Sequence, residues 1–282
     1  MRRSPLAGRR LLITGPARGI GGCTARLAAA RGARVALVGL EGDRLAALAD
    51  ELGPGHHWAE CDVTDHEGLD AAVAAAVTAF DGLDAVVANA GVITIAPVAT
   101  ASHEALARTV EVNLTGAIRT VHATLPHLID ARGYVLLVSS AAAFTAMPGL
   151  AAYAASKAAM EQFGNVLRVE TAHLGVRVGV AHPVWIDTDM LRGYAQYPAF
   201  DAARRRLPWP LDTVTSADDC ARALVRAIER RKRKVYVPRS LALVQAIRPV
   251  VQSRVGDRIT AVVTGAGDLV DRLNEEARSD AD

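Results

Sequence analysis

The chain has 282 residues, a formal net charge of +2 and 51% apolar residues. This length allows one large domain or two small ones, and the balanced charge gives no sign of a nucleic-acid-binding protein. Aromatic residues are scarce, at 4%, which further argues against binding of single-stranded nucleic acid.

Three cysteines, Cys23, Cys61 and Cys220, are far apart and form no Cys-x-x-Cys motif or Cys/His cluster. Neither a disulfide framework nor a metal site is expected, and reduced thiols fit a cytoplasmic protein. The basic N-terminus lacks the long apolar region of a signal peptide. No apolar run approaches the roughly 18 residues that a transmembrane segment requires, so none is expected.

Short apolar runs alternate with alanine-rich helical patterns along the chain. The predicted elements are, in order, strand 9–14, helix 21–31, strand 34–38, helix 44–52, strand 57–61, helix 69–80, strand 85–88, helix 104–132, strand 134–139, helix 153–174, strand 176–182, helix 216–230 and strand 235–237. This alternation predicts an α/β fold with a doubly wound parallel sheet and helices on both faces. No internal repeat or low-complexity linker divides the chain, which favours a single domain.

Glycines form a turn between the first predicted strand and the helix that follows, with the spacing Gly15-x-x-x-Gly19-x-Gly21. Glycine permits a tight turn and close approach of the backbone to a pyrophosphate, and free amides at a helix start bind negative charge. The position predicts a Rossmann-type dinucleotide-binding turn, and a purely structural turn is the alternative.

Tyr153 and Lys157 are four residues apart on a predicted helix, and Ser140 precedes the tyrosine by thirteen residues. Residues at this spacing share one face of a helix. A nearby ammonium group lowers the pKa of a tyrosine from about 10, which suits a general acid or base. The alternative for the pair alone is an exposed tyrosine and lysine on an amphipathic helix.

Together these motifs resemble the short-chain dehydrogenase/reductase family over about residues 8–238. Asn89-Ala90-Gly91 matches the family's motif after the fourth strand, Asp62 its aspartate near the adenine, and Thr188 its threonine that holds the nicotinamide carboxamide. The resemblance implies catalysis by Asn113, Ser140, Tyr153 and Lys157. It implies cofactor binding by Gly15, Arg18, Gly19, Ile20, Gly21, Leu40, Asp62, Val63, Asn89, Ala90, Gly91, Tyr153, Lys157, Pro183, Ile186 and Thr188.

The family resemblance also implies a role for each catalytic side chain. Tyr153 exchanges a proton with the substrate oxygen, and Ser140 orients that oxygen. Lys157 lowers the pKa of Tyr153 and holds the nicotinamide ribose. Asn113 supports a water that links Lys157 to solvent. The chemistry needs no metal.

Cofactor choice depends on the end of the second predicted strand, where Gly39 and Leu40 stand. An acidic residue at this point would bind the ribose 2′-hydroxyl of NAD. Gly39 and the basic Arg18, just before Gly19 in the glycine turn, favour NADP(H), whereas the absence of an arginine at position 40 and the presence of Glu41 leave NAD(H) open.

The second half of the chain departs most from the family pattern. Val184 replaces the usual glycine after Pro183, which predicts an altered path for this loop. Residues 190–212 correspond to the substrate lid, and their aromatic side chains predict a bulky or apolar substrate. Residues 230–234 are five cations, which complement a helix dipole or mark an anionic partner.

Residues 239–282 extend past the resemblance as a C-terminal extension with helical patterns. This extension could pack on the substrate mouth, join an oligomer interface or lie on a membrane surface as a peripheral contact. We expect an NADP(H)-dependent oxidoreductase of ketones or secondary alcohols that forms a homodimer or homotetramer. The alternatives are an NAD-dependent alcohol dehydrogenase, a 3-oxoacyl thioester reductase and a non-catalytic dinucleotide-binding regulator.

Overall fold

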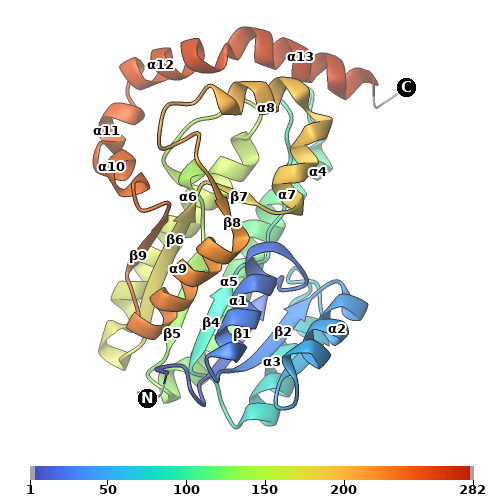
Figure 1. Ribbon diagram of the computed structural model, residues 1–282, viewed down its shortest axis with the longest axis vertical. Helices are drawn as coiled ribbons and strands as arrows, with labels where there is room; N and C mark the ends of the chain where they lie inside the picture. Colours follow the sequence, from blue (N-terminus) through green and yellow to red (C-terminus); the bar gives the residue numbers. More distant parts are fainter. Residues whose placement is uncertain (1–3, 280–282) are drawn as a thin grey trace.

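A parallel sheet forms the centre of the computed structural model, which describes residues 4–279 (Figure 1). Within these residues the sheet has seven strands in the order β3-β2-β1-β4-β5-β6-β9. The strands are β1 (Arg10–Thr14), β2 (Arg34–Gly39), β3 (His57–Glu60), β4 (Ala85–Ala88), β5 (Tyr134–Val138), β6 (Arg177–Pro183) and β9 (Lys234–Val237). Every residue of β4 and β5 is buried, as their unbroken apolar sequences predict.

Helices cover both faces of the sheet. On one face the core includes residues of α1 (Gly19–Ala30), α2 (Gly42–Leu52) and α9 (Ala217–Arg230). On the other it includes residues of α3 (His66–Phe80), α5 (Gly116–Asp130) and α6 (Ala151–Thr171). The predicted α/β fold with a doubly wound sheet in a single domain is confirmed.

The order of the strands places a crevice at the centre of the sheet. Strand β1 pairs with both β2 and β4, so the chain changes direction across the sheet at this point. In such folds ligands bind beyond the carboxyl ends of the strands where the order reverses. The glycine turn after β1 and the Asn89 segment after β4 both lie at this edge.

Two elements differ from the sequence prediction. The helix predicted over residues 104–132 consists of α4 (His103–Val110), a π-turn (Glu111–Thr115) and α5. A second, two-stranded sheet pairs β7 (Trp185–Asp187) with β8 (Val214–Ser216). A π-turn of five residues and strands of three residues are both too short to show a hydrophobic period of their own, so neither is visible in the sequence.

The lid and the extension form the end of the molecule beyond the sheet (Figure 1). The lid contains α7 (Asp189–Arg192), a 3-10 turn (Gly193–Gln196) and α8 (Pro198–Arg205). The extension contains α10 (Leu241–Ala246), α11 (Arg248–Val251), α12 (Arg254–Thr264) and α13 (Ala266–Ser279). Among the helices of residues 4–279, none combines the length and the hydropathy needed to cross a membrane.

Candidate active site

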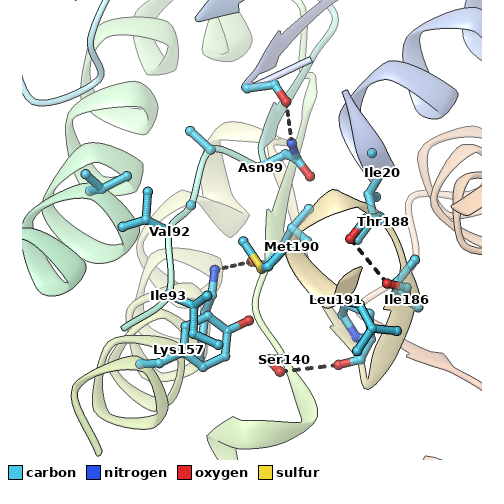
Figure 2. A pocket seen from close by; sticks show the side chains of 18 of the residues that line it. Ile20, Asn89, Val92, Ile93, Ser140, Lys157, Ile186, Thr188, Met190 and Leu191 are labelled. Carbon is cyan, nitrogen blue, oxygen red and sulfur yellow. Dashed lines mark hydrogen bonds between the residues drawn. The ribbon is translucent and has the colours of Figure 1, made fainter. Parts of the chain in front are cut away.

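A cavity of about 570 Å³ opens beyond the carboxyl ends of the central strands. The residues expected at the cofactor or the catalytic centre line it, apart from Gly21 and Asn113. Figure 2 shows Ser140 and Lys157 on its wall together with Asn89, Thr188 and the apolar side chains of Ile93, Met190 and Leu191. The structure therefore brings together residues that are up to 173 positions apart, from Gly15 to Thr188.

The glycine turn packs too closely against its neighbours to admit side chains. A Cβ added at Gly15, whose φ is +65°, would lie 2.9 Å from Cα of Ala90. A Cβ at Gly21 would lie 2.6 Å from Nδ2 of Asn89, so Gly21 supports the turn from behind. The first turn of α1 carries no acidic residue, and its free amides suit the pyrophosphate of a dinucleotide. The residues present thus fit this cofactor.

Asn89 connects the glycine turn to the sheet. Its Nδ2 donates hydrogen bonds to the carbonyl oxygens of Thr14 (3.0 Å) and Gly15 (3.1 Å). Its backbone N–H donates to the Thr14 hydroxyl. The polar groups of Asn89 therefore hold the turn after β1 against β4 through contacts within the chain itself.

Ion pairs occupy the adenosine end of the cavity. Arg18 Nη2 lies 2.6 Å from Glu41 Oε1, and Arg44 Nη1 lies 3.7 Å from the same oxygen. Leu40 is exposed and offers no polar group. Asp62 pairs with Arg108 at 2.8 Å, a contact that the sequence did not predict because the two residues are 46 positions apart.

Ser140 and Lys157 come from the end of β5 and from α6, respectively, and converge on Tyr153. Lys157 is buried, donates a hydrogen bond to the Val138 carbonyl (3.0 Å) and has its Nζ 5.6 Å from the centre of the Tyr153 ring. The Ser140 hydroxyl accepts a hydrogen bond from the Ala142 N–H and donates a long one, of 3.4 Å, to the Pro183 carbonyl. The neighbouring Ser139 instead donates to the Lys157 carbonyl, which fastens α6 to β5.

Burial dominates the proton affinities of Tyr153 and Lys157, the two titratable groups expected to take part in catalysis. It lowers the pKa of Lys157 from 10.5 to about 8. It raises the pKa of the Tyr153 phenol above its usual value of 10, and the Ser140 hydroxyl opposes this rise. This corrects the sequence expectation of a tyrosine pKa lowered by Lys157, because in the chain itself the loss of hydration outweighs the other effects.

Asn113 lies in the π-turn, behind the cavity wall. Its Oδ1 accepts a hydrogen bond from the Val92 N–H (2.8 Å), and its Nδ2 donates to the Val92 carbonyl (2.9 Å) and to Ser156 Oγ (3.1 Å). The side chain is fully buried, and a Cβ on Gly91 would lie 3.1 Å from Oδ1. Asn113 therefore joins the segment after β4 to α6, the helix that carries Tyr153 and Lys157.

A family model described as short chain dehydrogenase matches residues 9–198. The chain belongs to the short-chain dehydrogenase family. It is 36% identical over 200 residues to a trans-4-hydroxycyclohexanecarboxylate dehydrogenase of Sinomonas cyclohexanicum, covering 66% of this chain and 77% of that protein. It is 33% identical over 207 residues to a D-threitol dehydrogenase of Mycolicibacterium smegmatis, covering 72% and 80% of the two chains.

A third relative has a shorter match. An uncharacterized NAD-dependent oxidoreductase of Mycobacterium tuberculosis is 41% identical over 143 residues, which are 50% of this chain and 52% of that protein. This short-chain dehydrogenase is accordingly an oxidoreductase that acts on alcohol or carbonyl groups and uses a nicotinamide dinucleotide.

The part of the cavity expected to hold the nicotinamide lies between β6 and the lid. Pro183, Ile186 and Thr188 line the cavity there, and the Thr188 hydroxyl donates to the Ile186 carbonyl (3.2 Å). Val184 donates its N–H to the Val237 carbonyl and has no positive φ, so the chain continues from β6 toward β7 without a glycine. The chain then forms β7, which pairs with β8.

The part of the cavity expected to hold the substrate is apolar and rich in aromatic rings. Its lining includes Ile93, Met147, Leu150, Trp185, Leu191, Tyr194, Leu207 and Leu211. Trp185 meets Tyr194 and Phe200 edge to face, and its indole N–H donates to the Leu211 carbonyl. The indole thus both packs and borders the cavity.

Helix α13 supports this end of the dehydrogenase from outside. Leu269 and Leu273 pack in one cluster with Ile95, Tyr194 and Phe200. Asn274 Oδ1 accepts a hydrogen bond from the Thr100 hydroxyl at 2.8 Å. The apolar period of α13 predicts a helix with one buried face, but the sequence carries no signal for its partners, which lie about 70 to 180 residues earlier.

Proposed function

We propose that this dehydrogenase interconverts a bulky or apolar ketone and its secondary alcohol, with Tyr153 as general acid and base. The observation that carries the proposal is the convergence of Ser140, Tyr153 and Lys157 at the junction of the polar and apolar parts of one cavity. When bound, the nicotinamide supplies or accepts the hydride. In reduction the Tyr153 phenol gives its proton to the carbonyl oxygen, which the Ser140 hydroxyl orients.

Lys157 and Asn113 support this proton transfer. The Lys157 ammonium favours the phenolate when Tyr153 has lost its proton. The polar atoms of the Asn113 side chain are bound to Val92 and Ser156, so this side chain acts by positioning. A relay water beside Lys157 would therefore meet the backbone of the π-turn rather than the Asn113 amide.

The apolar lining of the substrate end supports the proposed substrate class. A 3-oxoacyl thioester reductase had one sequence argument, the basic run of residues 230–234. Lys234 begins β9, so this run lies at the amino end of a parallel strand, opposite the cavity. A carrier protein docked on this run would be at the wrong end of the sheet, and the simple ketone is the better candidate.

NADP(H) is the proposed cofactor, because Arg18 and Arg44 both lie within 4.0 Å of one oxygen of Glu41 and no acidic residue stands at position 39. Two guanidinium groups at this point can bind a 2′-phosphate. NAD(H) is the second candidate, favoured by the Arg18–Glu41 ion pair, since the Glu41 carboxylate repels a phosphate and accepts ribose hydroxyls. The name of the NAD-dependent mycobacterial relative supports it as well.

The mechanism is tested by Tyr153→Phe, which removes the proton donor and keeps the ring. We expect turnover of a reducible ketone to fall by at least about a hundredfold, with the dissociation constant of the cofactor unchanged. Steady-state kinetics and fluorescence titration measure the two quantities. Unchanged turnover in this variant would refute the role of Tyr153.

The cofactor is tested by titrating NADPH and NADH separately into the Arg18→Ala and Glu41→Gln variants. If the cofactor is NADP(H), Arg18→Ala weakens NADPH binding by about tenfold or more and leaves NADH binding nearly constant. Glu41→Gln frees Arg18 and tightens NADPH binding. If Glu41→Gln instead weakens NADH binding and Arg18→Ala affects both cofactors equally, NAD(H) is the cofactor.

A further inference from the structure

Six large apolar side chains of the extension point into solvent. Their exposed fractions range from 54% to 83%. We call them the apolar arc: Leu243, Ile247, Val250, Val255, Ile259 and Val262. Single exposed apolar residues are ordinary on protein surfaces, whereas a contiguous series marks an interaction site.

Helix α12 has its apolar face turned away from the protein. The residues it buries are Gly256 and Thr264, whereas Val255, Ile259 and Val262, spaced at four and three residues, are exposed. A helix that only completed the fold would turn such a stripe toward the core. Packing within residues 4–279 therefore gives no account of this stripe.

The α10–α11 segment continues the arc. Leu241 and Val244 are buried against the turn after Ser140, while Leu243, Ile247 and Val250 face outward. Residues 240–247 contain no charged side chain. The outer face of this segment is thus uncharged over two helical turns.

Cations flank the arc. Residues 239–264 contain four arginines and one aspartate, and because Arg248 is paired with Glu161, a net charge of +2 remains. Arg254 and Arg258 are exposed and lie beside the α12 stripe, each one position before an apolar residue of the arc, and Arg239 is exposed at the start of the extension. At 100° per residue Asp257 falls on the side of α12 away from the stripe. Such a helix buries its apolar stripe at a lipid surface while its arginines reach anionic headgroups.

We propose that the apolar arc and its arginines bind the surface of an anionic phospholipid membrane. The α10–α12 segments form an outer rim at the lid end of the molecule (Figure 1). A contact between two copies through this face would instead bring like-charged segments together around the two-fold axis. This proposal concerns binding alone and is independent of the proposed reaction.

Sedimentation of the full chain with lipid vesicles tests the proposal. We expect binding to vesicles of phosphatidylcholine and phosphatidylglycerol in equal amounts, about a hundredfold tighter than to phosphatidylcholine alone. Val262→Glu should abolish binding. The matched control is Val169→Glu, an equally exposed valine on α6, with 78% against 83% exposure, which should bind like the parent chain.

Three outcomes overturn the proposal. They are the absence of binding to either vesicle, equal binding to both vesicles, and equal loss in the Val262→Glu and Val169→Glu variants. Analytical ultracentrifugation without lipid supplies a fourth: if Val262→Glu lowers the oligomeric mass and no vesicle binds, the arc is an interface between copies. Circular dichroism of each variant shows that a loss of binding is not a loss of fold.

Discussion

At the scale of single residues, burial of the charged Lys157 side chain lowers the stability of the folded protein. The ammonium is buried, and its main-chain partner is one carbonyl, that of Val138. The fall of its pKa from 10.5 to about 8 corresponds to about 3 kcal/mol against the charged folded form. A residue kept at this cost fits a functional rather than a packing role.

Lys157→Met should stabilise the protein and inactivate it. The variant avoids the cost of burying the ammonium but loses the hydrogen bond to Val138, which is worth about 1 kcal/mol. We therefore expect the free energy of unfolding to rise by about 2 kcal/mol at pH 7, measured by urea unfolding. In the parent chain the unfolded state binds more protons between pH 8 and 10.5, so its stability rises with pH across that window and is constant below it. The advantage of the variant should shrink accordingly above pH 8.

The control for this prediction is Lys157→Arg, which keeps the charge and should give no gain in stability. A Lys157→Met variant that is less stable than the parent chain at pH 7 would contradict the assigned cost of burial.

At the scale of elements, Arg248 connects the extension to the catalytic helix. Its Nη1 lies 2.9 Å from Glu161 Oε2 on α6, and its Nη2 donates to the Ala143 carbonyl in the turn after Ser140. Glu161 is one helical turn beyond Lys157. Burial would raise the pKa of Glu161, but His182, Arg248 and Lys234 together hold it at about 2.

Arg248→Met should destabilise the protein by about 1.5–3 kcal/mol, because it leaves a buried carboxylate with fewer donors. The contribution of Glu161 is fully present above pH 4.5 and is lost as the pH falls toward 2, so the difference from the parent chain should shrink in acid. Urea unfolding at pH 7 and near pH 3 measures both effects. Arg254→Met, at an exposed arginine of α12, should stay within about 0.5 kcal/mol of the parent chain.

At the scale of the whole molecule, the two ends of the cavity are built differently. The cofactor end is made by the turns after β1, β2 and β4, close to the sheet. The substrate end is made by the lid, the segment after β4 and α13, which meet in one apolar cluster. Substitutions at the lid end can therefore change the substrate pocket or the outer surface without altering the sheet and its glycine turn.

The fold and the composition of the site could largely be predicted, and their detailed contacts could not. Unbroken apolar strands such as β5 and the glycines after β1 are local signals. They predicted the parallel sheet and the turn. The four-residue spacing of Tyr153 and Lys157 and the family resemblance predicted that these two residues and Ser140 converge. The π-turn at Asn113 has no local signal of its own, because five residues are too few to show a separate hydrophobic period.

By itself the sequence determined most of the order of strands and helices, since this follows from hydrophobic period and turn chemistry, and its resemblance to a known family indicated which residues gather at the carboxyl edge of the sheet. The tertiary structure alone decided the pairings of Glu41 with Arg18 and of Glu161 with Arg248, the support of the lid by α13, and the outward face of α12. The sequence does not show which residue a charged side chain or an apolar helix face will contact. Packing across long separations determines which of them are neutralised, which are buried, and which remain exposed for another surface.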